Sequence, residues 1–227
     1  MIRAVVFDFD GLILDTETNE YHAYADTYRH HGAELPLEVW SRVIGTDMLS
    51  VFDPYVYLEE RTGKPVDREK FQTMRRQLFT ERMAQEQLRP GVVSVLEQAK
   101  ELGLRIGLAS SSSIDWITGY MDKFGIGGYF SIMRTRDNVA KVKPDPELYR
   151  QAVEHLGVQP HEALAFEDSP NGALAAFRAG LHCVIVPNAV TGTLAFGEHS
   201  KRIATMEGLD LERLLKELSP ERPVSSL

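Results

Sequence analysis

The chain has little cysteine, no long apolar run and no excess of positive charge. Its single cysteine, Cys183, has no partner for an intrachain disulfide, so nothing in the sequence points to an oxidising compartment. No stretch approaches the roughly 18 apolar residues of a membrane span. The 33 acidic side chains outnumber the 25 basic ones and give a net charge of −8. This acidity disfavours a nucleic-acid partner, because proteins that bind nucleic acid present a basic surface.

The apolar N-terminal segment, residues 1–14, begins with Arg3 and at first sight resembles a signal peptide. Asp8 and Asp10 stand inside it, and the apolar region of a signal peptide does not normally carry two carboxylates. We therefore expect a cytoplasmic protein without membrane contact, and a monomer in preference to an oligomer. The composition is that of a globular protein, and 227 residues suit one large domain or one and a half.

The chain contains two regions with different patterns of predicted secondary structure. Strands are predicted over residues 2–9, 105–109, 129–134, 163–166 and 182–186, and helices over 92–102, 114–124, 147–156, 171–179 and 209–218. This alternation is typical of βαβ units and a parallel sheet. Residues 16–87 instead repeat apolar side chains at spacings of three and four, without a convincing strand. The sequence therefore predicts an α/β protein: a Rossmann-like, doubly wound parallel sheet core (1–15 and 88–227) with an inserted four-helix cap (16–87).

Polar side chains follow the ends of several predicted strands. In open parallel sheets, ligands bind at the carboxyl ends of the strands. The polar residues that the chain delivers to this edge are Asp8, Asp10, Gly11, Ser110, Lys141, Lys143, Glu167 and Asp168. Four separate segments thus bring carboxylates, a hydroxyl and lysines to one edge, which predicts a reaction site there.

Asp8 and Asp10 are two residues apart, so a strand end places both on one face. Carboxylates at close range repel each other, and the pair is costly without a cation. Together with Glu167 and Asp168 they form a set of hard oxygen donors that suits magnesium. The alternative is a turn-forming Asp-X-Asp-Gly with a capping role. We weigh it less, because unpaired charge at the end of a buried strand is costly.

Ser110 and Lys143 each have two interpretations. Ser110 stands just before a predicted helix, where hydroxyls and free amides form an anion cradle. The alternative there is N-capping by Ser112 or Ser113, and different serines can serve the two roles. Lys143 precedes Pro144, which fixes the backbone, and would offset the charge of carboxylates beside a phosphate. The alternative is a solvated loop lysine.

These segments together resemble the four motifs of the haloacid dehalogenase superfamily. The matching segments are Asp8-Phe-Asp10-Gly11-Leu-Ile-Leu-Asp15-Thr16-Glu17, Leu108-Ala-Ser110-Ser111-Ser112, Lys143-Pro144-Asp-Pro146 and Phe166-Glu167-Asp168-Ser169-Pro170-Asn-Gly172. Their order and spacing fit the superfamily, and the helical insertion is similar to the small cap of the beta-phosphoglucomutase-like branch. The resemblance implies a magnesium-dependent phosphatase that hydrolyses a small phosphorylated metabolite, such as a sugar phosphate.

The resemblance also implies a role for each motif residue. Asp8 would be the nucleophile that forms an aspartyl-phosphate. Asp10 would protonate the leaving oxygen and then activate water. Magnesium would be held by the Asp8 side chain, the Asp10 backbone carbonyl and Asp168, with Glu167 at or near the metal. The residues implied to bind the phosphate group are Gly11, Ser110, Ser111 and Lys143, with Lys143 also taking part in catalysis.

The cap is where the resemblance weakens. The positions expected to contact substrate are Thr16, Glu17, Glu20 and Gly45. Beta-phosphoglucomutases of this branch carry an arginine shortly after a cap glycine, where this chain has Met48, and a histidine near the position of Glu20. Both departures disfavour a mutase, because losing the arginine removes a bidentate clamp for a second phosphate.

Three further alternatives are weaker. A phosphonatase needs a cap lysine for Schiff-base chemistry, but Lys64 and Lys70 stand in polar contexts typical of a solvated face. A phosphate-accepting signalling or binding module is much shorter, has no cap, and places its acidic pair and its acceptor on different strands. An inactive homologue is disfavoured because no motif residue is missing.

Overall fold

The computed structural model describes residues 1–41, 44 and 52–219. Within them, six strands form one sheet in the order β3-β2-β1-β4-β5-β6, and every neighbouring pair is parallel. The strands are β1 (Ala4–Phe7), β2 (Arg105–Ala109), β3 (Ile132–Arg134), β4 (Ala163–Glu167), β5 (His182–Ile185) and β6 (Lys201–Arg202). The predicted class, a Rossmann-like parallel sheet with helices, is confirmed.

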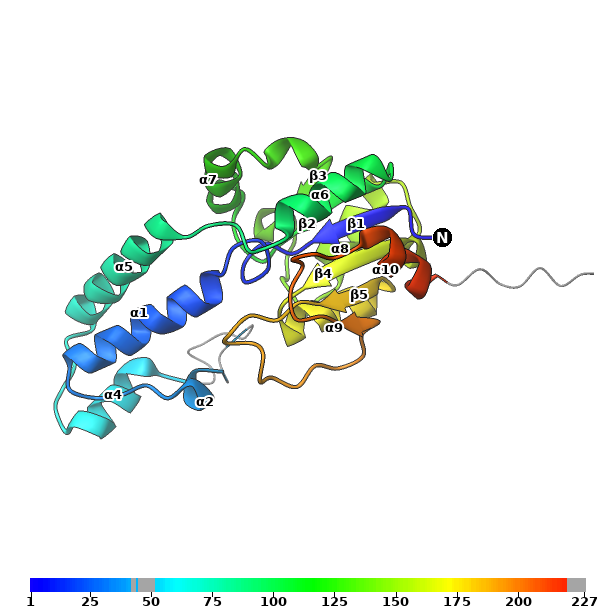
Figure 1. Cartoon of the computed structure of the whole chain (residues 1–227). Coiled ribbons are helices and arrows are strands. Elements are labelled where there is room, and N and C mark those ends of the chain that lie inside the picture. The colour runs from blue at the N-terminus through cyan, green and yellow to red at the C-terminus, as the bar shows by residue number, and fades with distance from the viewer. Residues whose placement is uncertain (42–43, 45–51, 220–227) are drawn as a thin grey trace, which may run out of the picture.

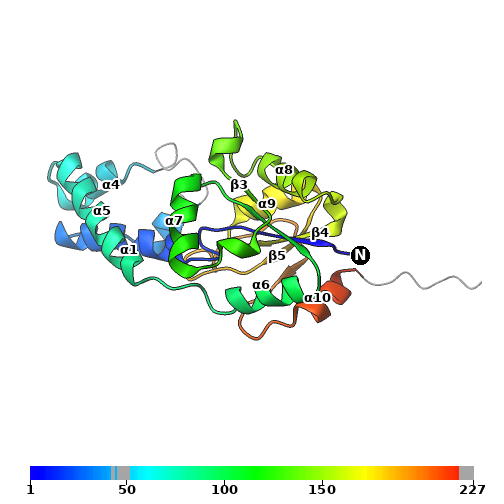
Figure 2. The ribbon, with the colours of Figure 1, turned by 90° about the horizontal axis from the view of Figure 1, so that it is seen from above.

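Helices cover both faces of this sheet (Figures 1 and 2). They are α6 (Val92–Glu101), α7 (Ile114–Phe124), α8 (Glu147–His155), α9 (Pro170–Ala179) and α10 (Leu211–Leu218). Val5 and Phe7 of β1 pack with α6, α7 and α10, whereas Ala4 and Val6 point to the opposite face and pack with α8 and α9. Burial on both faces explains why this strand reads as a continuous apolar run.

The core helices begin and end at the residues that the sequence signals. Ser113, Ser169 and Asp210 stand just before α7, α9 and α10, and each side chain accepts a hydrogen bond from a backbone N–H of the first turn. Gly125 and Gly180 follow α7 and α9 with φ of 66° and 84°, a left-handed conformation that favours glycine. These helix-capping residues fix where the helices begin and end.

The helices between residues 16 and 87, called the cap below, lie beyond the carboxyl edge of the sheet (Figure 1). Those described are α1 (Thr16–His30), α2 (Leu37–Trp40), α4 (Pro54–Thr62) and α5 (Arg68–Gln85). The cap has an aromatic centre, where the rings of Tyr24 and Trp40 lie 4.6 Å apart and Phe71 meets Tyr28 edge-on. This centre is a hydrophobic cluster separate from the two clusters of the sheet.

The structure differs from the expected strands in several places, and the strand expected over 2–9 is shortened to Ala4–Phe7. The strand expected over 129–134 is shortened to β3, because Gly127–Tyr129 forms a 3-10 turn. The edge strand β6 has only two residues, Lys201 and Arg202, and carries no apolar pattern that a sequence reading detects. Within the described residues, no helix combines the length and apolar character needed to cross a membrane.

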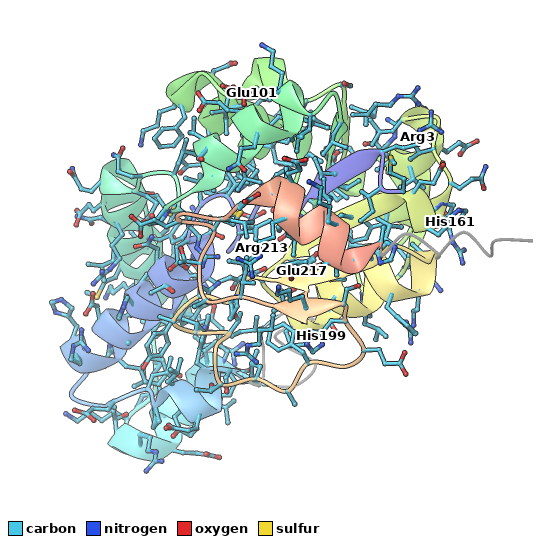
Figure 3. All side chains as sticks on the ribbon, turned by 45° about the vertical axis from the view of Figure 1, so that its right-hand side comes forward. Arg3, Glu101, His161, His199, Arg213 and Glu217 are labelled. Atoms are coloured by element: carbon cyan, nitrogen blue, oxygen red, sulfur yellow. The ribbon has the colours of Figure 1, made fainter. Side chains whose placement is uncertain are left out.

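The face around α10 carries charged side chains, among them Arg213 and Glu217 (Figure 3). Arg213 and Glu217 on this helix form an exposed ion pair at 3.1 Å. Exposed pairs of this kind contribute little to stability. The acidic surplus of the chain thus includes solvated surface groups as well as the buried carboxylates described next.

Candidate active site

A cavity of about 980 Å³ lies where the carboxyl ends of the strands face the cap. The predicted site residues that line it are Asp8, Asp10, Thr16, Glu17, Glu20, Ser110, Ser111, Lys143 and Asp168. Glu167 and Gly11 lie directly behind this lining, in contact with Lys143 and Asp168 respectively. Gly45 and Met48 lie outside the described residues, and Lys141 is exposed on its loop.

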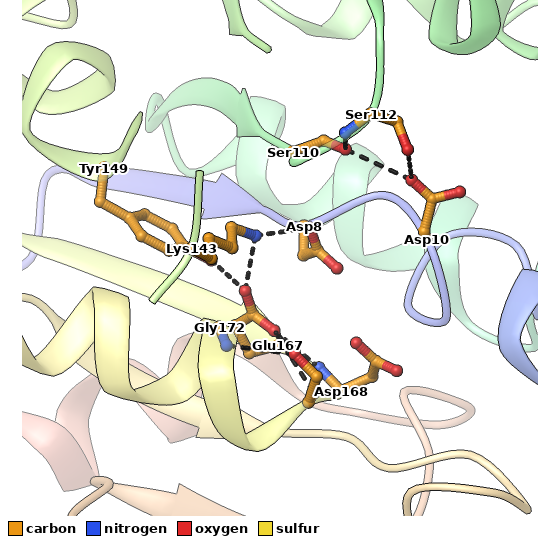
Figure 4. A network of polar contacts seen from close by, with 10 residues as sticks. Asp8, Asp10, Ser110, Ser112, Lys143, Tyr149, Glu167, Asp168 and Gly172 are labelled. Carbon is orange, nitrogen blue, oxygen red and sulfur yellow. Dashed lines mark hydrogen bonds and ion pairs between the residues drawn. The ribbon is translucent and has the colours of Figure 1, made fainter. Parts of the chain in front are cut away.

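Lys143 is a buried cation between two carboxylates (Figure 4). Its Nζ lies 2.5 Å from Asp8 Oδ1 and 2.6 Å from Glu167 Oε1, and its side chain is only 6% exposed. Burial opposes its charge, yet the two carboxylates hold the pKa of Lys143 above its usual range. The alternative of a solvated loop lysine is therefore wrong.

Both oxygens of Glu167 are engaged by protein groups. Oε1 accepts a hydrogen bond from the Tyr149 hydroxyl at 2.6 Å as well as from Lys143. Oε2 accepts from the backbone N–H of Asp168 at 3.2 Å and from the Ser169 hydroxyl at 3.3 Å. A Cβ at Gly172 would overlap this carboxylate, so only glycine fits there. Glu167 is thus locked in place behind the cavity and holds Lys143 toward Asp8.

Asp8, Glu167 and Asp168 each offer a carboxylate oxygen to one spot, with the three oxygens within 4.8 Å of one another. All three side chains are buried. Burial and then the charge of Glu167 raise the pKa of Asp8 to about 8, and burial and Asp8 raise that of Asp168 well above its usual range. Three buried acids with one lysine leave uncompensated negative charge, and hard oxygen donors suit magnesium. The residues present therefore fit a divalent cation.

Two neighbours place Asp168. The Asn188 amide donates to Asp168 Oδ2 at 2.8 Å and to the Gly11 carbonyl at 3.3 Å. Gly11 has a φ of +78°, and a Cβ there would overlap the Asp168 carboxylate. The tight turn after β1 therefore needs glycine for its backbone conformation and for the close approach.

The carboxylate of Asp10 turns away from the three acids. Its Oδ2 accepts hydrogen bonds from the hydroxyls of Ser112 at 2.6 Å and Ser110 at 3.3 Å. Its Oδ1 accepts from the indole N–H of Trp116 at 2.9 Å. Ser113 caps α7, so the capping role is confirmed, and phosphate binding by Ser110 and Ser111 stays a prediction. Metal binding through the Asp10 carbonyl stays a prediction.

The cap side of the cavity carries polar groups of its own. Arg75 donates two hydrogen bonds to Glu20, at 2.9 and 3.1 Å. Its Nε and the Thr16 hydroxyl are buried, and neither has a hydrogen-bond partner among the described residues. Burial, followed by the charges of Asp10 and Asp8, raises the pKa of Glu17 to about 8. This wall presents hydroxyl, guanidinium and carboxyl groups to the cavity.

Four residues of the site were not predicted from the sequence: Tyr149, Asn188, Arg75 and Trp116. Asn188 follows β5, so the strand-end rule applied to that strand would have found it. The other three lie inside helices, and only the packing of those helices brings them to the cavity or to its buried carboxylates.

Residues 5–186 match the model of the family described as "Haloacid dehalogenase-like hydrolase". YhcW of Bacillus subtilis (strain 168), whose name describes a candidate phosphatase, is 50% identical over 97% of this chain and 100% of its own. The "Phosphorylated carbohydrates phosphatase" of Thermotoga maritima is 30% identical over 79% of this chain and 82% of its own.

Among solved structures, a Thermotoga maritima protein described as a candidate beta-phosphoglucomutase has a TM-score of 0.73 and 26% identity. The likeness covers 96% of this chain and 100% of that one. Sequence, fold and the arrangement of the buried polar groups thus agree, and the chain belongs to the haloacid dehalogenase-like hydrolase family.

Proposed function

We infer that this phosphatase hydrolyses a small phosphorylated metabolite, a sugar phosphate or a similar monoester, and that it depends on magnesium. The observation that carries the inference is the buried cluster of Asp8, Lys143, Glu167 and Asp168 at the floor of the cavity. A nucleophile, a fixed cation and room for a metal meet there, which are the parts that phosphoryl transfer needs.

Asp8 is the nucleophile in this proposal. Its Oδ attacks phosphorus, the bond from phosphorus to the ester oxygen breaks, and the departing oxygen takes a proton from Asp10. Asp10 then removes a proton from water as that water attacks the aspartyl-phosphate, which releases phosphate and restores Asp8. Lys143, fixed by Glu167, offsets the negative charge that the nucleophile and the phosphate bring together.

Magnesium would be held by the side chains of Asp8 and Asp168 and by the backbone carbonyl of Asp10. Glu167 would lie behind these ligands, because both its oxygens already accept hydrogen bonds from protein groups. When bound, the metal supplies positive charge that stabilises the transferring phosphoryl group. Ser110 and Ser111 at the cavity wall are the proposed hydrogen-bond donors to the phosphate group.

The proposed substrate class rests on the cap wall and on the names of relatives. A phosphorylated-carbohydrate phosphatase and a hexitol phosphatase are among the proteins similar to this chain. The Glu20–Arg75 pair, the Glu17 carboxyl and the Thr16 hydroxyl, which has no hydrogen-bond partner in the described part of the chain, suit the hydroxyls of such a molecule.

The test is phosphate release from a panel of hexose and hexitol monophosphates and from p-nitrophenyl phosphate, with and without magnesium. We expect magnesium-dependent release from at least one sugar ester and none with Asp8→Asn. No release from any ester by the wild-type protein would overturn the proposal. Activity that requires a sugar bisphosphate primer would identify a mutase instead.

A further inference from the structure

Trp116 stands in the first turn of α7 and reaches the carboxylate of Asp10. Its indole N–H donates to Asp10 Oδ1 at 2.9 Å, while Ser112 and Ser110 donate to Oδ2. Ser113, the cap residue of the helix, accepts the Trp116 backbone N–H at 3.4 Å and so fixes the start of the turn that carries the indole. Both oxygens of this half-buried carboxyl group are therefore held from the core.

The indole N–H and the serine hydroxyls place different requirements on the Asp10 oxygen that each one faces. An indole N–H donates only, so the oxygen facing it must remain an acceptor, whereas a serine hydroxyl donates or accepts. Ser110 Oγ also accepts the backbone N–H of Ser112 at 3.0 Å, which orients that hydroxyl. A carbonyl oxygen accepts a hydrogen bond better than a protonated oxygen does, so the indole favours a protonated Asp10 that carries its hydrogen on Oδ2 and keeps Oδ1 bare toward Trp116.

The cap touches the same indole. Phe79 of α5 stacks on Trp116, with ring centroids 6.1 Å apart and planes at 20°. On the core side, Tyr120 meets the indole edge-on at 4.8 Å. Phe79 and Trp116, together with Arg75, line both the main cavity and a second one of about 560 Å³ between α5 and α7. The indole thus sits between a cap ring and a core ring, and its place depends on where the cap lies.

We propose that Trp116 is a positioning residue that fixes the acidic proton of Asp10 on Oδ2. In this proposal, Phe79 of the cap holds the indole in the position from which it donates to Asp10. The proposal rests on the proposed function, because it assigns Asp10 the proton that the leaving oxygen receives. When the cap lies over the substrate, Phe79 holds the indole against Asp10, and Asp10 then carries its proton on Oδ2.

The test compares two esters in the first turnover, before the aspartyl-phosphate is hydrolysed. A sugar alkoxide leaves only with a proton, whereas p-nitrophenolate leaves without one. Trp116→Phe keeps an aromatic ring and removes the N–H. We expect it to slow release of the sugar about tenfold, within the range of general acid catalysis, with p-nitrophenol release and the KM for both esters changed less than about twofold.

Phe79→Leu removes the cap ring and leaves the N–H. We expect the same pattern, slower sugar release with an unchanged p-nitrophenol burst, at about threefold. Tyr120→Phe is the matched control, because it keeps the ring against the indole and removes only a hydroxyl. It should match the wild-type protein on both esters. Thermal unfolding of each variant confirms that the fold is kept.

The outcomes separate the two proposals. If Trp116→Phe slows both esters equally, or neither, the positioning role is wrong, whatever the wild-type activity. If Trp116→Phe shows the ester-dependent loss and Phe79→Leu does not, the coupling to the cap is overturned. A wild-type protein that releases phosphate from neither ester contradicts the proposed function itself.

Discussion

The carboxyl edge of the sheet and the cap wall face each other across one cavity, but they are built differently. At the sheet edge, Lys143 and Glu167 are 6% and 0% exposed, and each makes two or more short polar contacts. On the cap wall, Glu20 and Arg75 are 26% and 16% exposed and pair mainly with each other. The proposed reaction groups, which lie at strand ends and on the loop of Lys143, thus oppose the proposed selection groups on the cap helices.

This difference has a physical basis. Hydrogen bonds to neighbouring strands fix where β1 and β4 end, so Asp8 and Glu167 have little freedom. The cap helices are held by an aromatic cluster, whose packing tolerates shifts better than a hydrogen-bonded ladder does. We therefore expect changes at the sheet edge to abolish the reaction and changes on the cap wall to alter which substrate is accepted.

The largest effect should come from Asp8→Asn, which removes the proposed nucleophile. We expect phosphate release to fall by about 10³-fold or more. Stability without metal should stay equal or rise, because burial already raises the pKa of Asp8 to about 8 and its charge is unfavourable there. Phosphate assays and thermal unfolding check this. Asp115→Asn, at an exposed position of α7, is the control; an Asp8→Asn protein that unfolds earlier would contradict the account.

Removal of metal should have the next largest effect. Chelation is expected to lower activity about 100-fold, with recovery when magnesium is returned. Magnesium should also raise the thermal unfolding midpoint of the wild-type protein, because it binds the folded state and offsets the charge of the buried acids. In Asp168→Asn this rise should vanish. An equal rise in that variant would place the metal elsewhere.

Arg75→Gln tests the cap wall and should have a smaller, selective effect. It leaves Glu20 unpaired beside the substrate, so we expect kcat/KM for sugar phosphates to fall about tenfold. The value for p-nitrophenyl phosphate, which has no sugar hydroxyls, should change less than about twofold. Arg68→Gln, on the exposed side of the same helix, is the matched control. Equal losses of kcat/KM on both esters would contradict the proposal that the cap wall selects the substrate.

The smallest effect concerns Glu17, whose pKa burial raises from 4.5 to about 8. A raised carboxyl pKa means that the folded state binds a proton more tightly, so stability is lost as pH rises from 4.5 through 8. Glu17→Gln removes this loss. In chelator, the variant and wild type should unfold alike at pH 4.5, and the variant should be more stable by about 1 kcal/mol at pH 9.

A difference between Glu17→Gln and wild type that is largest at low pH would show that the side chain is stabilised as a carboxylate. That result would remove Glu17 from the set of cap groups whose charge is unfavourable.

Much of the sheet edge follows from local rules. A strand that is buried on both faces needs a continuous apolar run, and the polar residues that follow must lie at its end, so Asp8, Ser110 and Asp168 were placed correctly. The partners were not predictable. Tyr149 lies on α8, and its hydroxyl meets Glu167 only because that helix packs on the sheet.

The cap could be predicted only as helices. Periodicity shows that α1 and α5 form, because local spacing determines their apolar faces. It does not show which residues of the two helices meet, so Arg75 and its pairing with Glu20 were missed. The roles assigned to the motif residues stay predictions, because the arrangement of side chains alone does not reveal which bond breaks.

The sequence by itself determined the fold class, the family and the residues that gather at the carboxyl edge, because these depend on periodicity and on order along the chain. Only the tertiary structure decided that Lys143 is buried between Asp8 and Glu167, and that Trp116 reaches Asp10. Contacts between residues a hundred positions apart depend on how helices and loops pack, and no local pattern encodes that distance.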